Sequence, residues 1–192
     1  DRGYPRYHFS KHPSRGFDIS INSEKFTARI PPEIPPYPVW GNNIGCFDNE
    51  VTINSKYDIY LAGDSFTWGY APLEKKFGTL LEERLDLNIA ACGVTHTGQI
   101  HQFDKFKEIS NQLGYFPQTV IVNVIGNDIE DDYLFPHATI IDGYQVDMAH
   151  KVERFGSIAV KRSSESELRH KLKRQMEKKS TSRFGKFDPR NY

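Results

Sequence analysis

The chain has 192 residues, a formal net charge of zero and 38% hydrophobic residues, which is enough for one domain with a buried core. This neutral balance gives no general argument for nucleic acid or an anionic membrane as a partner. No apolar run approaches the length of a membrane span, and the first residues lack the apolar core of a signal peptide. We therefore expect a soluble chain, and the sequence does not indicate its compartment.

Residues 1–50 form an aromatic and proline-rich segment, which we expect to be extended and packed on the domain that follows. Residues 17–22 alternate apolar and polar side chains and predict a short strand. Residues 31–38 are predicted to be extended, because proline fixes φ and constrains the residue before it. We expect this stretch to brace its own domain, although it could also bind an aromatic groove.

Residues 51–160 alternate strand-like and helix-like segments. Short apolar runs at 57–62, 88–92 and 118–125 predict buried strands. Between them, residues 72–85 and 99–113 repeat apolar side chains every three or four positions, as amphipathic helices do. The alternation predicts parallel βαβ units in a flavodoxin-like α/β fold with flanking helices.

The pattern weakens after residue 128. Asp142-Gly143 lies between β-formers and predicts a hairpin over residues 138–146, and residues 157–161 predict one more strand. Residues 161–192 carry eleven Lys/Arg and four Asp/Glu, and we expect a basic helical and loose tail there. A helix over 165–179 would have a narrow apolar stripe and a solvated charged face, which does not favour a nucleic-acid surface. The last dozen residues are expected to be loose.

No cofactor or metal is expected. The histidines do not pair with cysteines or carboxylates at ligand spacing, and no Gly-rich phosphate loop occurs. Cys46 and Cys92 are expected to be buried free thiols, with a disulfide between them as the alternative.

The most informative residues follow the first and third predicted strands. Ser65 lies in the turn Gly63-Asp64-Ser65, and Asn127-Asp128 follows the third strand. Open α/β folds place their ligands at this carboxyl edge of the sheet. Together with the Asn-x-x-Gly-x-x-Asp pattern at residues 42–48, this order resembles the SGNH (GDSL-type) hydrolase superfamily of esterases, lipases and carbohydrate acetylesterases. The resemblance covers residue 42 to about residue 132.

The resemblance implies a role for three residues. Ser65 would be the nucleophile, and its own backbone N–H, the backbone N–H of Gly93 and the side chain of Asn127 would be the oxyanion donors. Two positions depart from the family pattern. His96 stands where the loop after the second strand usually has a second glycine, and Gly126 directly precedes Asn127 instead of lying one residue earlier.

The catalytic base is the weakest point of the resemblance. The family supplies it from an Asp-x-x-His motif that follows two further βα units. The sequence contains this motif at Asp147 and His150, but it follows Asn127 too closely for those units to intervene.

Of four other histidines, two are further candidates for the catalytic base and two are not. His96 and His101 lie near the loop after the second strand, whereas His137 and His170 are expected at the surface. We therefore expect that the chain lacks its intended base and is weakly active or inactive. An incomplete sheet would also leave an open edge, which the 138–146 hairpin or a second subunit could cover.

The resemblance implies that the chain removes small acyl groups, such as acetyl, from carbohydrate through Ser65. No stretch offers the long apolar lid of a lipase. Two alternatives remain open: a non-catalytic SGNH-like domain that binds a carbohydrate or a partner protein, and a polysaccharide O-acyltransferase that uses the same residues.

Overall fold

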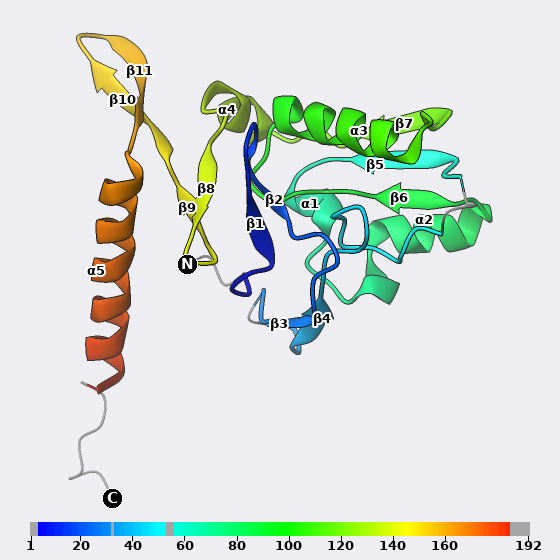
Figure 1. The fold of residues 1–192 in the computed structure, drawn as a ribbon, viewed down its shortest axis with the longest axis horizontal. Coiled ribbons are helices and arrows are strands. Elements are labelled where there is room, and N and C mark those ends of the chain that lie inside the picture. The colour runs from blue at the N-terminus through cyan, green and yellow to red at the C-terminus, as the bar shows by residue number, and fades with distance from the viewer. Residues whose placement is uncertain (1–3, 32, 53–55, 185–192) are drawn as a thin grey trace, which may run out of the picture.

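The molecule is a mixed α/β structure built around three parallel strands (Figure 1). They are β5 (Ile59–Ala62), β6 (Ile89–Ala91) and β7 (Thr119–Val122), in the spatial order β6-β5-β7. Both outer strands pair in parallel with β5. The prediction that the three strands form one parallel sheet is therefore confirmed, and their following turns share one edge. The computed structural model describes residues 4–31, 33–52 and 56–184.

Helices α2 (Phe77–Leu85) and α3 (Gln99–Leu113) cover opposite faces of this sheet (Figure 1). Successive side chains of a strand point to opposite faces, so Tyr60 packs with the α3 side chains and Leu61 packs with those of α2. Helix α3 has the predicted bounds and ends at Gly114, whose φ of 74° suits glycine.

The predicted helix over 72–85 is divided in two. Leu73–Lys75 forms a 3₁₀ turn, η1, and α2 begins only at Phe77 because Lys76 is extended. The Lys76 ammonium donates to the Phe47 carbonyl and lies 4.3 Å from the Phe47 ring centroid. This buried contact holds the turn before α2 against the segment that leads into β5.

The N-terminal segment forms two hairpins. Strands β1 (Phe9–His12) and β2 (Gly16–Ile19) pair antiparallel, as do β3 (Phe26–Ala28) and β4 (Tyr37–Val39). The prediction that residues 31–38 are extended is confirmed only at the end of this range, where Tyr37 and Pro38 lie in β4. Earlier in the range, Ile34 N donates to Pro31 O in a turn; Pro32 lies outside the described residues. The core between these hairpins and the central unit consists of Phe9, Phe17, Ile19, Ala28, Tyr37, Val39, Phe47, Trp68, Val94 and Ala138.

The C-terminal part contains two more hairpins and a long helix. Strands β8 (Ala138–Ile141) and β9 (Tyr144–Asp147) turn at Asp142-Gly143, both with positive φ, which confirms the predicted hairpin. Strands β10 (Ala149–Arg154) and β11 (Ser157–Arg162) pair with each other, and only β11 was expected.

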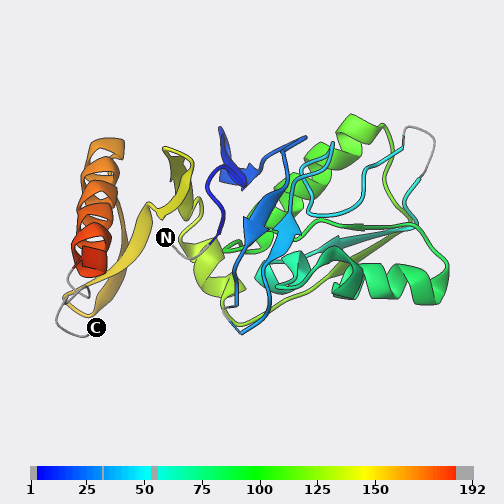
Figure 2. The same ribbon diagram turned by 90° about the horizontal axis from the view of Figure 1, so that it is seen from below.

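Helix α5 (Glu165–Phe184) is longer than predicted and stands apart from the central sheet, as both views show (Figures 1 and 2). Leu168 and Leu172 pack against Ile141 of β8, whereas Met176 is exposed. The remainder of the expected loose tail, residues 185–192, lies outside the described residues. None of the described helices combines the length and the apolar character that crossing a membrane requires.

Cys46 and Cys92 form a disulfide, so the expectation of free thiols was wrong. The two Cα atoms are 4.7 Å apart although 46 residues separate them in the sequence. The bond joins the loop before β5 to the end of β6, on the α3 side of the sheet. This closeness depends on the folded path of the chain, which cysteine spacing alone does not reveal.

A buried ion cluster attaches the first hairpin to α3. The Asp18 carboxylate accepts from the Lys105 ammonium and from the Arg15 guanidinium, at 2.7 Å for Arg15 Nη2. Lys105 Nζ also donates to Gly45 O at 2.6 Å. Burial acts to raise the pKa of Asp18, but Lys105, His101 and Arg15 outweigh it and lower the pKa to about 2.

Removing the disulfide should lower the melting temperature. A link that closes a loop of 46 residues restricts the unfolded chain and stabilises the fold by about 4 kcal/mol. We expect the double variant Cys46→Ala/Cys92→Ala to melt well below the oxidised wild type in calorimetry. Added reductant should lower the wild-type melting temperature and leave the double variant unchanged. Equal melting temperatures of the oxidised wild type and the double variant would show that the disulfide does not form or does not stabilise the fold.

Asp18→Asn should destabilise the fold by about 3–5 kcal/mol at neutral pH, because Lys105 and Arg15 would keep buried charges without their carboxylate. The pKa of Asp18 is lower in the folded than in the unfolded state. Its stabilisation is therefore complete above about pH 4 and is lost as the pH falls toward 2. When the pH is lowered from about 6 to about 3, the free energy of unfolding measured in urea should fall more for wild type than for Asp18→Asn. Equal decreases would exclude this role of Asp18.

Candidate functional site

Ser65 begins a short helix, α1 (Ser65–Trp68), directly after β5. Asp64 precedes this helix as its N-cap, and its Oδ1 accepts from Phe66 N at 3.0 Å. Ser65 Oγ donates to Asp64 Oδ2 at 3.3 Å. Asp64 is fully buried, whereas Ser65 is partly exposed. The serine hydroxyl is thus held at the carboxyl edge of the sheet, where a ligand can reach it.

Asn127 reaches the same carboxylate from the end of β7. Its Nδ2 donates to Asp64 Oδ2 at 3.0 Å and to Asp131 Oδ2 at 3.2 Å. Asn127 precedes helix α4 (Asp128–Tyr133), a short acidic helix that the sequence did not predict. The structure therefore brings Ser65 and Asn127 together through one oxygen atom of Asp64.

Gly93 lies against α1, close to Ser65. A Cβ atom at Gly93 would be 2.1 Å from Trp68 N and 2.7 Å from Asp64 O, so the loop after β6 touches the backbone around the serine. His96, in the same loop, has a φ of 58°, a conformation that glycine adopts more readily.

The buried side of α1 packs against the N-terminal segment. Trp68 is fully buried and its Nε1 donates to His8 Nε2 at 3.1 Å. Burial, together with the positive charges of Lys105 and Lys76, lowers the pKa of His8 to about 3, so His8 stays a neutral acceptor. Tyr4 packs edge-on against Trp68 and donates to or accepts from Tyr70 at 2.7 Å between hydroxyl oxygens.

His137 is held between two carboxylates, and the prediction that it is a surface residue was wrong. Its side chain is 11% exposed, with Nδ1 3.1 Å from Asp131 Oδ1 and Nε2 3.5 Å from Asp147 Oδ1. Its ring centroid is 6.1 Å from that of His96. Asp147 thus contacts the site through His137 rather than through the Asp-x-x-His motif.

The other histidines lie elsewhere. His101 is buried and its Nε2 is 2.9 Å from Phe17 O, and His170 is exposed beside Arg174 on α5. His150 is exposed on β10, opposite Lys161 of β11, and the structure does not bring it to the serine. Among the described residues, the hydroxyl of Ser65 has a carboxylate and no imidazole as its hydrogen-bond partner.

The carboxylates of α4 differ in charge environment. Burial raises the pKa of Asp128, and the negative charge of Asp64 adds to this, although Ile125 N donates to Asp128 Oδ2 at 3.0 Å and opposes it. Burial acts in the same direction on Asp131, but its contacts with His137 and Asn127 prevail and hold its pKa below the ordinary value. Asp131 therefore stays an anion beside Asn127.

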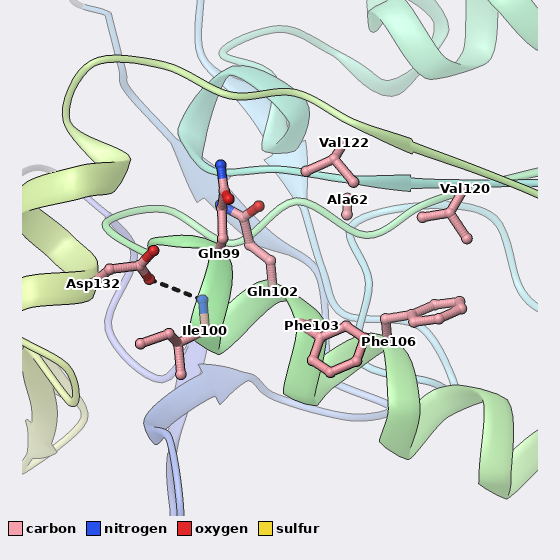
Figure 3. Close-up of a pocket in the computed structure, with 9 residues that line it drawn as sticks. All are labelled: Ala62, Gln99, Ile100, Gln102, Phe103, Phe106, Val120, Val122 and Asp132. Atoms are coloured by element: carbon pink, nitrogen blue, oxygen red, sulfur yellow. Dashed lines mark hydrogen bonds between the residues drawn. The ribbon is translucent and has the colours of Figure 1, made fainter.

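An apolar pocket of about 470 Å³ lies between α3 and β7 (Figure 3). Phe103 and Phe106 of α3 face Val120 and Val122 of β7 across it, while Asp132 accepts from Ile100 N at 2.8 Å at one end. Within the described residues, β7 pairs with β5 alone and its other edge is open. The β8–β9 hairpin pairs within itself and lies beside β1 and β2 instead.

Comparisons with known proteins give no family for the chain: no family model matches it, and no curated protein or solved structure is significantly similar. In the part of the chain that the structure describes, no three His, Cys, Asp or Glu side chains gather as a metal site.

Gly93→Ala should displace α1, because the added methyl would meet Trp68 N and the backbone of Thr67 at 2.5 Å or less. We expect a lower melting temperature and a change in the near-ultraviolet circular dichroism of Trp68. Gly126→Ala is the matched control, since its added methyl would have no neighbour within 4 Å. If both variants melt like wild type, the loop after β6 does not touch α1 as described.

Proposed function

We propose that the chain is a serine ester hydrolase with a flavodoxin-like, SGNH-type domain and that Ser65 is its nucleophile. One observation carries the proposal. Ser65 and Asn127 come from the ends of two parallel strands, and both donate to Asp64 Oδ2, at 3.3 Å and 3.0 Å. A hydroxyl and an amide donor converge there at the edge of the sheet, as acyl transfer through a serine requires.

The reaction would follow from these groups. Ser65 Oγ attacks the acyl carbon, its proton passes to Asp64 Oδ2, and the carbonyl oxygen becomes the oxyanion. The donors would be Asn127 Nδ2 and the backbone N–H groups of Ser65 and Gly93. Collapse of the oxyanion releases the alcohol, which takes the proton from Asp64. Water then attacks the acyl-serine and passes a proton to Asp64 Oδ2; the bond to Ser65 Oγ breaks, Oγ regains that proton, and the carboxylic acid leaves. A carboxylate is a weaker base than an imidazole toward a serine hydroxyl, so turnover should be slow.

The substrate class is a small acyl ester, such as an acetyl group on carbohydrate. The resemblance of residues 42–132 to carbohydrate acetylesterases supports this class. The two side chains linked to the Ser65 hydroxyl by hydrogen bonds, Asp64 directly and Asn127 through Asp64, are polar and suit a small group better than a long apolar chain. The Cys46–Cys92 bond supports an oxidising compartment, where disulfides persist.

A non-catalytic binding domain is the second candidate. It is favoured by the partner of Ser65, since the hydroxyl donates to Asp64 and not to a histidine. In this case the same edge would bind a carbohydrate or a partner protein without covalent chemistry. Turnover and labelling separate the two candidates.

Ser65→Ala should abolish the hydrolysis of a small aryl acetate, measured as released phenol, because no nucleophile remains. An organophosphonate should add to wild type at Ser65, located by peptide mass spectrometry, and should not add to the variant. Ser166→Ala, on exposed α5, is the control and should keep wild-type turnover. Equal turnover by wild type and Ser65→Ala would reject the enzyme proposal and leave the binding domain.

A further inference from the structure

The amide of Asn127 is oriented by two carboxylates. An asparagine side chain has nearly the same shape when its oxygen and nitrogen are exchanged, so its partners decide which atom points where. Both Asp64 Oδ2 and Asp131 Oδ2 lie at hydrogen-bond distance from Nδ2, at 3.0 Å and 3.2 Å. An ionised carboxylate only accepts hydrogen bonds, so these two partners select the NH₂ group.

Asp131 is well placed to act on Asn127. The two residues are four positions apart at the start of α4, which puts them on the same side of the helix. Asp131 is 7% exposed, and its second oxygen lies 3.1 Å from His137 Nδ1. His137 is in turn 3.5 Å from Asp147 of β9. These contacts connect the β8–β9 hairpin to the Asn127 amide, which shares Asp64 Oδ2 with Ser65.

We propose that Asp131 is a positioning residue that fixes the amide orientation of Asn127, and that His137 anchors Asp131. The inference rests on the proposed function, in which Asn127 is an oxyanion donor. As the oxyanion forms, Asn127 exchanges its bond to Asp64 for a bond to the substrate oxygen and keeps its bond to Asp131. The lowered pKa of Asp131 fits this role, since the acceptor stays charged.

Loss of Asp131 would act on catalysis through Asn127. Without this acceptor, the amide oxygen could turn toward the developing oxyanion, where it would repel the charge. The backbone of the site would remain, because Asp64 still caps α1 through Phe66 N. The effect is therefore expected in kcat rather than in KM, as for an interaction made in the transition state.

A double-mutant cycle on ester turnover tests the coupling. Asn127→Ala should lower kcat on the order of a hundredfold, and Asp131→Ala roughly ten- to a hundredfold through misplacement of the donor. In the Asn127→Ala background, Asp131→Ala should cost almost nothing further. Glu130→Ala is the control, because this exposed α4 carboxylate pairs with Lys151 at 3.2 Å and should keep wild-type kcat. Additive losses would overturn the proposal.

A second readout does not depend on turnover. In ¹H–¹⁵N spectra, the side-chain amide pair of Asn127 is identified as the pair missing from Asn127→Asp. Asp131→Ala should shift that pair and speed its exchange with solvent, and His137→Ala should do so to a smaller extent. Asp131→Asn, which keeps the volume and one acceptor oxygen, covers the case in which the alanine variant does not fold. An unchanged pair in all these variants would overturn the proposal.

Loss of the proposed function and loss of the positioning role of Asp131 give different experimental results. If Ser65→Ala does not reduce turnover, the proposed function fails, while the amide spectra still decide whether Asp131 orients Asn127. If Ser65 is required but the cycle is additive, the enzyme stands and the positioning role fails.

Discussion

The buried carboxylate of Asp64 is the interaction on which the site depends. It accepts from Phe66 N at 3.0 Å, from Ser65 Oγ at 3.3 Å and from Asn127 Nδ2 at 3.0 Å. A buried charge is costly without such donors, so the three bonds also determine where the donors must lie. One side chain therefore starts α1, holds the serine hydroxyl and ties the loop after β7 to the loop after β5.

The remaining structure keeps these loops in place. The parallel sheet brings the ends of β5, β6 and β7 to one edge, and the Cys46–Cys92 bond fastens the segment before β5 to the end of β6. Beneath α1, the neutral imidazole of His8 accepts from Trp68. The N-terminal hairpins thus form the support behind the serine, and Asp18 with Lys105 joins the first hairpin to α3.

The sequence predicted the parts of the fold that repeat a simple period. Helix α3 matched its predicted bounds because its apolar spacing is regular and Gly114 ends it. Helix α4 was missed because its residues are mainly acidic and show no apolar stripe. The pairing of Asn127 with Asp131 has a four-residue spacing that would indicate a shared helix face, but only after a helix is assumed. His137 could not be placed, since its carboxylate partners come from two separate elements.

Ser65 and Asn127 are proposed to act on one acyl group, Ser65 Oγ on its carbon and Asn127 Nδ2 on its oxygen. The most direct test is a crystal structure of the protein after treatment with an organophosphonate. We expect a phosphorus atom bonded to Ser65 Oγ, with a phosphoryl oxygen within hydrogen-bond distance, about 2.7–3.2 Å, of Asn127 Nδ2 and Gly93 N. An unmodified Ser65, or an adduct whose phosphoryl oxygen points away from Asn127, would contradict it.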